Sequence, residues 1–215
     1  MRQLTEKVHS KNVHVSSLYS EKEAEDFLEK NNLNVVQRKF TNKKTDLQKI
    51  KINFPWVMKI SSKKIMHKAR VNGVKTNINS IKEAEKCFDE ISKIENFEEV
   101  IIQKMIFGKE IIIGIKNTPE FKHVLMFGKG GSNIEKEKDV SFRVIPIDNK
   151  EIESMIDDTK FSKELNKKEI KNIIETINKI QKLIKKYPKI EELDINPLIV
   201  NDKEYIVADA RLVIK

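Results

Sequence analysis

The sequence predicts an α+β fold, because strand-like and helix-like segments are mixed along the chain and several neighbouring strands look antiparallel. Three helix starts are marked by a capping pair, in which a serine or asparagine is followed three residues later by glutamate. Short apolar segments rich in β-branched residues mark the strands. No internal repeat or low-complexity linker interrupts the 215 residues, a length that fits one or two domains.

The N-terminal segment combines an irregular start with a capped helix. Residues 1–15 show no clear hydrophobic period, and we expect a loose tail there. Ser20 and Glu23 then form the first capping pair, and apolar residues follow at helical spacing. The run NNLNVVQRKF breaks this helix and is expected to begin a short strand around Val35 and Val36.

The following segment predicts a strand, a turn and a second helix. The apolar run FPWVMKI contains Lys59 and is typical of a buried strand, and Asn72-Gly73 predicts a turn after it. Ser80 and Glu83 repeat the capping pair. The helix that they begin has an apolar stripe formed by Ile81, Ala84, Phe88 and Ile91.

The rest of the chain is expected to hold most of the strands and one long helix. Four strands are predicted within residues 98–106, 109–117, 123–131 and 139–147. A hairpin around Asn201-Asp202 closes the chain. The long helix begins at the capping pair Asn166 and Glu169, and its apolar stripe is Ile170, Ile173, Ile174, Ile177, Ile180 and Ile184.

Composition restricts the class of protein. Lys and Arg number 42 against 33 Asp and Glu, which gives a net charge of +9. This balance permits binding to nucleic acid, nucleotides or an acidic partner. Lys and Asn are abundant throughout the chain, however, and form no separate basic segment. We therefore expect no nucleic-acid partner, and a basic nucleic-acid binder stays as an alternative.

The single cysteine and the hydropathy pattern indicate the compartment. Cys87 is the only cysteine, so we expect neither an intrachain disulfide nor a cysteine-based metal site, and its place on the second helix predicts a core residue. No apolar run has the length of a membrane span, and the first residues lack the apolar segment of a signal peptide. We expect a cytoplasmic protein with no membrane partner.

Three segments could bind phosphate. Lys59, at the exit of an apolar strand, could meet a phosphate as a point charge or extend to solvent as a surface lysine. The loop MHKARVNGV carries several cations and a glycine, which together can wrap phosphate oxygens. His67 in this loop could be a nucleophile, a general acid or base, or a bystander. The glycines of FGKGGSNIEKEKD permit close approach to a ligand, or simply form a mobile turn.

The closing hairpin places polar side chains within its most apolar segment. Asn196 and Asp209 are expected on paired strands, and Asp194 projects to the same face as Asn196. A carboxylate and an amide oxygen are ligands that Mg²⁺ prefers, with phosphate and water completing the shell. Buried acids without such compensation cost on the order of several kcal/mol. The alternative is that these acids lie at strand ends in solvent.

Together these motifs resemble a known family. FPWVMKI…HK…GVK, LMFGKGG, DVSFRVIPI, ELDINPLIV and VADARLVI occur in the order and spacing of the β subunit of ADP-forming acetate–CoA ligases, also called acetyl-CoA synthetases. The chain is similar, more distantly, to the β subunit of succinyl-CoA synthetase. The match runs from about Leu18 to Ile214. It implies an ATP-grasp fold over residues 16–215, in which two α+β lobes clamp a nucleotide, with a hinge near residues 103–106.

The resemblance also implies a reaction, cofactors and a partner. In this family an acyl-CoA and phosphate give an acyl phosphate, which phosphorylates a histidine on a separate α subunit. The phosphoryl group then passes to ADP on the β subunit and makes ATP. The expected cofactors are Mg²⁺ and ADP/ATP. The expected partner is a CoA-binding α subunit in an α2β2 heterotetramer, and the chain alone is expected to be inactive.

The family pattern assigns nucleotide-binding roles by position. Lys59 matches the strand lysine that contacts phosphate, and His67, Lys68 and Ala69 match the phosphate-covering loop. The remaining nucleotide contacts are the hinge, which meets the adenine, and an acid that faces the nucleotide: Gln103, Lys104, Met105 and Glu110.

Catalytic and metal-binding roles come from the same resemblance. Asn196 and Asp209 match the Mg²⁺ ligands, and Asp194 matches the acid that steadies the phosphohistidine. His67 matches a histidine that carries the phosphoryl group briefly between the α subunit and ADP. An imidazole suits this task because it is a good nucleophile and, once phosphorylated, a good leaving group.

The sequence departs from the family pattern at four places. Arg70 stands where an acid is typical, Asn72 where a glycine is, and Lys104 where a glutamate is. The usual FGP ahead of the glycine-loop strand is replaced by FKH at residues 121–123. These changes motivate an alternative, a non-catalytic nucleotide-binding subunit that regulates or scaffolds an α-like partner. A ligase of another acid is a further alternative. An active enzyme is favoured because the central residues are all present: Lys59, His67, Asp194, Asn196 and Asp209.

Overall fold

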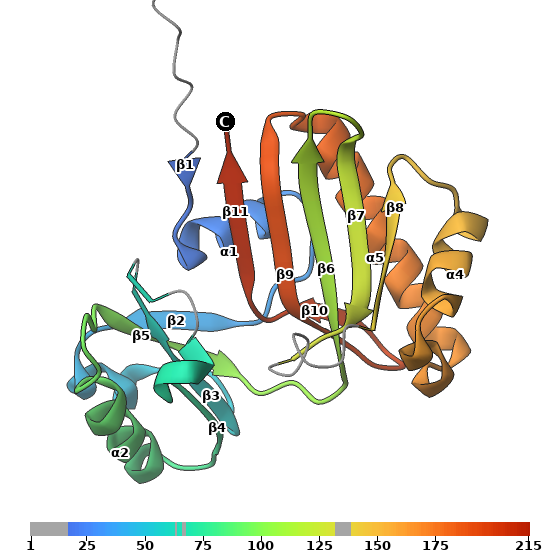
Figure 1. Cartoon of the computed structure of the whole chain (residues 1–215). Helices are drawn as coiled ribbons and strands as arrows, with labels where there is room; N and C mark the ends of the chain where they lie inside the picture. The colour runs from blue at the N-terminus through green and yellow to red at the C-terminus, as the bar shows by residue number, and fades with distance from the viewer. Residues whose placement is uncertain (1–16, 63, 66–67, 132–138) are drawn as a thin grey trace, which may run out of the picture.

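The computed structural model describes residues 17–62, 64–65, 68–131 and 139–215. Two sheets form two lobes, joined where β5 leads into β6 (Figure 1). The predicted α+β class is confirmed, and the predicted tail at residues 1–15 lies outside the described residues. None of the helices in the described part of the chain has the length and apolar character needed to cross a membrane.

The small lobe is a four-stranded antiparallel sheet with one α-helix against it. The strand order is β2 (Arg38–Thr41), β5 (Glu99–Lys104), β3 (Trp56–Ser61) and β4 (Val74–Ile78). The helix α2 (Ile81–Ile91) and the 3₁₀ turn η1 (Lys44–Lys49) cover it. A second 3₁₀ turn, η2 (Lys68–Val71), precedes β4. Trp56, Met58 and Ile60 fill a core that belongs to this lobe alone.

The large lobe is a seven-stranded antiparallel sheet. Its order is β1 (Ser17–Leu18), β11 (Ala210–Ile214), β9 (Ile190–Val200), β6 (Lys109–Thr118), β7 (Lys122–Lys129) and β8 (Val140–Val144), and β10 (Tyr205–Val207) also pairs with β9. One face is packed by α5 (Lys167–Lys186), with α4 (Asn149–Asp157) and η3 (Lys160–Glu164) beside it (Figure 1).

The helix α1 (Glu21–Lys30) comes before the small lobe in sequence but packs on the large one. Ala24 and Leu28 are fully buried in the large-lobe core, and the helix lies against β11. Its polar side therefore points toward the junction of the two lobes, where it meets residues of β2 and β5. This packing brings three distant parts of the chain to one place.

Most predicted elements are confirmed. The capping boxes at Ser20 and Asn166 are complete, and β10 and β9 form the predicted hairpin. At Ser80 only half of the box forms, because the Glu83 carboxylate accepts the N–H of Asn79 instead. Cys87 is partly buried and packs against the small-lobe core, as predicted.

Several elements differ from the prediction. The short strands β1 and β4 and the 3₁₀ turns were not predicted. Val35 makes only an isolated bridge to Val207, and the strand begins at Arg38, since the segment before it crosses from one lobe to the other. The helix α4 was not predicted at all. Its signal is a complete capping box between Asp148 and Glu151 that follows directly on a predicted strand.

Candidate functional site

Lys59 extends from the small lobe into the junction with the large lobe. It lies in the middle of β3 and is only 7% exposed, so the surface-lysine alternative is wrong. Its Nζ donates to the Ala208 carbonyl at 2.8 Å and lies 3.9 Å from Oδ2 of Asp209. A buried ammonium therefore faces the segment that joins β10 to β11.

Lys68 adds a second cation at the same point. This residue begins η2, and its Nζ lies 2.7 Å from Oδ2 of Asp209 and 2.5 Å from Oε2 of Glu21. Both acids belong to the large lobe, whereas Lys68 and Lys59 belong to the small one. Two ammonium groups of the small lobe thus meet two carboxyl groups of the large lobe.

The local environment perturbs the ionisation of this cluster. Burial, and then the charge of Asp209, raises the pKa of the Glu21 carboxyl to about 7, although Lys68 acts in the opposite direction. Burial alone lowers the pKa of Lys68, but the carboxylates of Asp209 and Glu21 outweigh it, so the pKa of Lys68 is raised. Lys68 is therefore held as a cation, which is the form that attracts a phosphate.

Asn196 and Asp209 lie side by side, but only Asn196 is on a strand: Asp209 lies in the segment between β10 and β11, not on a paired strand as predicted. The Asn196 N–H donates to the Asp209 carbonyl at 3.1 Å, and the Oδ1 of Asn196 accepts the N–H of Gly131 at 3.1 Å. The donor set, one carboxylate and one amide oxygen, fits Mg²⁺, which usually takes one or two carboxylates and completes its shell with phosphate and water. Within the described ranges, no three His, Cys, Asp or Glu side chains form a metal cluster.

Asp194 lies on the same strand, two residues before Asn196. It stands opposite Gly114 of β6 and Arg211 of β11, and it is exposed. Partial desolvation and then the charge of Asp209 raise the pKa of Asp194, and Arg211 offsets only part of this effect. Asp194 therefore shares the electrostatic field of the Asp209 cluster while remaining open to solvent.

The glycine-rich turn after β7 connects Glu110 with Asn196. The Gly130 N–H donates to the Glu110 carbonyl at 2.8 Å. Gly131 has φ +95°, and a Cβ on it would lie 2.5 Å from the carboxylate of Glu110. Only glycine tolerates both this backbone conformation and this close approach. The turn thus brings backbone N–H groups to the edge of the candidate site.

The hinge strand β5 reaches the same junction. Gln103 is 2% exposed, and its Nε2 donates to the Ala208 carbonyl at 3.0 Å and to Oε1 of Glu25 at 3.4 Å. The side-chain amide of Gln103 is therefore used in contacts between the lobes. A contact between the adenine and the backbone of the predicted hinge stays a prediction. Lys104 is exposed and Met105 is half-buried at the end of this strand.

The acids of α1 were missed by the sequence reasoning. Glu25 is fully buried and pairs with Nε of Arg38 at 2.8 Å, and burial followed by the charge of Glu21 raises its pKa to about 8. Arg38 also contacts Glu29. The available signal was the spacing of Glu21, Glu25 and Glu29, which lie four residues apart and so share one helix face.

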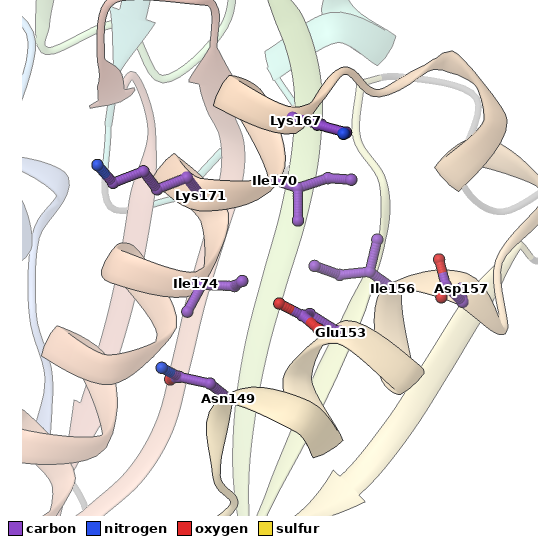
Figure 2. A pocket seen from close by; sticks show the side chains of 8 residues that line it. All are labelled: Asn149, Glu153, Ile156, Asp157, Lys167, Ile170, Lys171 and Ile174. Carbon is purple, nitrogen blue, oxygen red and sulfur yellow. The ribbon is translucent and has the colours of Figure 1, made fainter.

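His67 is not among the described residues, so its predicted role stays a prediction. A groove of about 460 Å³ lies between α4 and α5, with Ile156, Ile170 and Ile174 between charged side chains (Figure 2). None of the predicted site residues that the structure describes lines this groove.

Comparison with known proteins agrees with this architecture. The model of the ATP-grasp domain family matches residues 13–214. The β subunit of acetate–CoA ligase [ADP-forming] I from Pyrococcus furiosus is 36% identical over 180 residues, which cover 76% of each chain. Acetate–CoA ligase [ADP-forming] I from Archaeoglobus fulgidus is 37% identical over 177 residues, or 76% of this chain and 26% of that protein. The chain thus spans about a quarter of this longer relative.

Solved structures show the same fold. Acetyl-coenzyme A synthetase 1 of Ca. Korarchaeum cryptofilum, in complex with coenzyme A, Ca-AMPCP and HgCl+, has a TM-score of 0.82 and 32% identity, with 93% of both chains covered. A second structure of that protein contains coenzyme A and Mg-AMPPCP, with a phosphohistidine segment pointing towards the nucleotide binding site. Its TM-score is 0.76 at 32% identity, over 92% of this chain and 93% of that one.

Proposed function

The chain belongs to the ATP-grasp domain family and, within it, to the β subunits of ADP-forming acetate–CoA ligases, and we propose that it is the nucleotide-binding component of an ADP-forming acyl-CoA synthetase. In the proposed reaction, a phosphoryl group passes from a phosphohistidine of an α subunit through His67 to ADP. The products of the full cycle are ATP, CoA and a carboxylate. The similarity of this chain to the β subunit from Pyrococcus furiosus supports a separate α partner.

The convergence of Lys59 and Lys68 on Asp209 is the observation that carries the proposal. Two ammonium groups from the small lobe face one carboxylate of the large lobe, at 3.9 and 2.7 Å. A nucleoside diphosphate that enters between the lobes meets both cations. Phosphoryl transfer depends mainly on positioning and charge neutralisation, which these residues supply.

Asn196 and Asp209 would hold Mg²⁺ together with the nucleotide phosphates. The ion supplies neutralisation of the negative charge on the transferring phosphoryl group and on ADP. Under this proposal Asp209 gives up its ion pair with Lys68 when it becomes a ligand, and this exchange would free the ammonium of Lys68 for a phosphate oxygen. Mg-AMPPCP in the Korarchaeum enzyme supports this assignment.

His67 and Asp194 are proposed to act on the phosphoryl group itself. His67 lies directly before Lys68 in sequence, so the loop that carries the phosphate-binding cation also carries the proposed nucleophile. Asp194 is exposed next to the Asp209 cluster, where an incoming phosphohistidine could donate a hydrogen bond to its carboxylate. A phosphohistidine ring N–H is fixed in orientation by such an acceptor.

The departure at Asn72 is compatible with an active enzyme. Asn72 has φ +54°, the left-handed conformation that glycine adopts freely and that asparagine tolerates better than most other residues. The turn after η2 therefore forms although the family glycine is absent: the N–H of Gly73 donates to the Lys68 carbonyl at 2.8 Å. This observation favours the enzyme over a non-catalytic nucleotide-binding subunit.

Reconstitution with the α subunit tests the proposal. The chain is mixed with its α partner, acetyl-CoA, phosphate and Mg-ADP, and ATP is measured with a luciferase assay. ATP formation that requires both proteins and phosphate is expected. Absence of ATP from a complex that is shown to be assembled, with a panel of other acyl-CoA substrates also inactive, would support the scaffold alternative.

A further inference from the structure

Glu21 contacts the proposed phosphate loop from outside the predicted site. Its Oε2 lies 2.5 Å from Nζ of Lys68, and its side chain is 9% exposed. Glu21 is the first residue of α1, which is anchored in the large-lobe core. The contact therefore ties the η2 turn of the small lobe to a rigid element of the other lobe.

The ammonium of Lys68 has two acidic partners, and only one of them stays available when nucleotide binds. Asp209 is the proposed metal ligand, so its carboxylate turns from Lys68 to the ion under the proposed function. Lys68 is only 15% exposed, so its ammonium needs an anionic partner while Asp209 turns to the ion and before a phosphate oxygen reaches it. Glu21 is the acid that remains beside it among the described residues.

The second oxygen of Glu21 is consistent with this role. Oε1 is buried and accepts no hydrogen bond from the described residues. The Glu21 carboxylate thus has an unused acceptor next to Lys68, so that the ammonium can shift between the two oxygens without losing its acid. A buried oxygen that accepts no hydrogen bond lowers the stability of the fold. Its presence in Glu21 therefore points to a role other than folding.

We propose that Glu21 is a positioning residue for Lys68: it holds the Lys68 ammonium between the lobes while Asp209 exchanges this ion pair for the metal ion. The inference rests on the proposed function, because it assigns the geometry of the same nucleotide site. Glu21 itself contacts neither nucleotide nor metal in this scheme. Its effect on binding must therefore pass through Lys68.

A double-mutant cycle tests this dependence. The dissociation constant of Mg-ADP is measured by calorimetry on the full chain for the unsubstituted protein, Glu21→Gln, Lys68→Met and the double variant. We expect Glu21→Gln alone to weaken binding about tenfold, the scale of one charged hydrogen bond. In the Lys68→Met background, the same change is expected to have no further effect.

Two further variants distinguish the positioning of Lys68 by Glu21 from a general loss of folding and from a change in net charge. Glu21→Asp keeps the charge and is expected to bind Mg-ADP within about threefold of the unsubstituted chain. Glu29→Gln removes an acid from the same helix face, where its pair with Arg38 is exposed, and is expected to bind normally. Thermal unfolding of each variant verifies that it folds.

The outcomes are distinct. Unchanged or tighter binding by Glu21→Gln, or an equal loss with and without Lys68, overturns the role of Glu21 while the proposed function stands. If the unsubstituted chain itself fails to bind Mg-ADP, the proposed function is contradicted first and the role of Glu21 falls with it.

Discussion

Nζ of Lys68 lies 2.7 Å from Oδ2 of Asp209, so the lysine of the proposed phosphate loop in one lobe and the proposed metal ligand of the other form an ion pair. Loss of one partner from an ion pair that is shielded from water is costly, because the other charge is left uncompensated. A magnesium-bound nucleotide offers each partner a replacement: the metal ion for Asp209 and a phosphate for Lys68. The lobes can therefore remain together before and after the ligand enters.

The first prediction concerns Asp209 as a metal ligand. Asp209→Asn keeps the shape of the side chain but removes its charge, and we expect Mg-ADP binding to weaken at least tenfold, a loss of about 1.4 kcal/mol. ADP binding in excess EDTA should change much less. Titration calorimetry with and without Mg²⁺ measures both. Asp202→Asn, in the turn before β10, is the matched control, and an equal loss with EDTA would argue against metal ligation.

The second prediction uses the raised pKa of Glu25. Burial and then Glu21 and Asp209 favour its protonated form, and Arg38 and Lys59 oppose them, so the pKa rises from 4.5 to about 8. Between these values the folded chain binds a proton that the unfolded chain has released. The free energy of unfolding therefore decreases as pH rises from about 5 to about 8, by up to about 4 kcal/mol from this group.

Urea unfolding at pH 5.5 and pH 8 measures this difference. Glu25→Gln cannot titrate, so its free energy of unfolding should vary less between the two pH values than that of the unsubstituted chain. Glu153→Gln, on the exposed side of α4, should leave the pH dependence intact. A pH dependence that is the same in Glu25→Gln and the unsubstituted chain would show that Glu25 is ionised in the folded state throughout.

The third prediction concerns Gly131. Its φ is +95°, a conformation that alanine rarely adopts, and a Cβ at this position would approach the Glu110 carboxylate to 2.5 Å, so Gly131→Ala strains the turn and displaces the Glu110 side chain. We expect a loss of about 1–2 kcal/mol in stability and weaker Mg-ADP binding, because Gly131 also donates to Asn196. Thermal unfolding and calorimetry measure the two effects. Gly114→Ala, where the nearest atom is the flexible end of Met126 at 3.0 Å, should perturb nucleotide binding less.

The fourth prediction concerns the proposed phosphoryl carrier. In the reconstituted complex, His67→Ala should abolish ATP synthesis and leave phosphate-dependent labelling of the α-subunit histidine intact, since only the transfer to ADP needs His67. Radiolabelled phosphate with acetyl-CoA, followed by electrophoresis, separates the two steps. His123→Ala, in β7, is the control. Full turnover by His67→Ala would show that the phosphoryl group passes directly between the α subunit and ADP.

Local sequence patterns predicted the elements that carry the site but not the contacts that assemble it. The strand around Lys59 and the proximity of Asn196 to Asp209 follow from short apolar runs and a turn signal, which are local properties. The contacts of Lys59 and Gln103 with Ala208 join residues more than 100 positions apart. Single-sequence patterns carry no record of such long-range contacts.

The acids of α1 show why charge patterns are hard to interpret. Glu21 and Glu25 resemble ordinary solvent-facing residues of an amphipathic helix, because a charged stripe usually faces water. Here the stripe is covered by the small lobe, and Arg38 and Lys68 neutralise it. The helix α4 was missed for a different reason. The sequence contains its capping box, but the box follows a predicted strand directly, with no turn signal between them to mark a new element.

A crystal structure of the chain with Mg-ADP is the decisive experiment for this nucleotide site. We expect ADP between the lobes, with its phosphates in contact with Lys59 and Lys68. Mg²⁺ should lie about 2.1 Å from an oxygen of Asp209 and from Oδ1 of Asn196. Nucleotide bound at another place, or a metal ion with no contact to Asp209 while its ion pair with Lys68 remains, would contradict it.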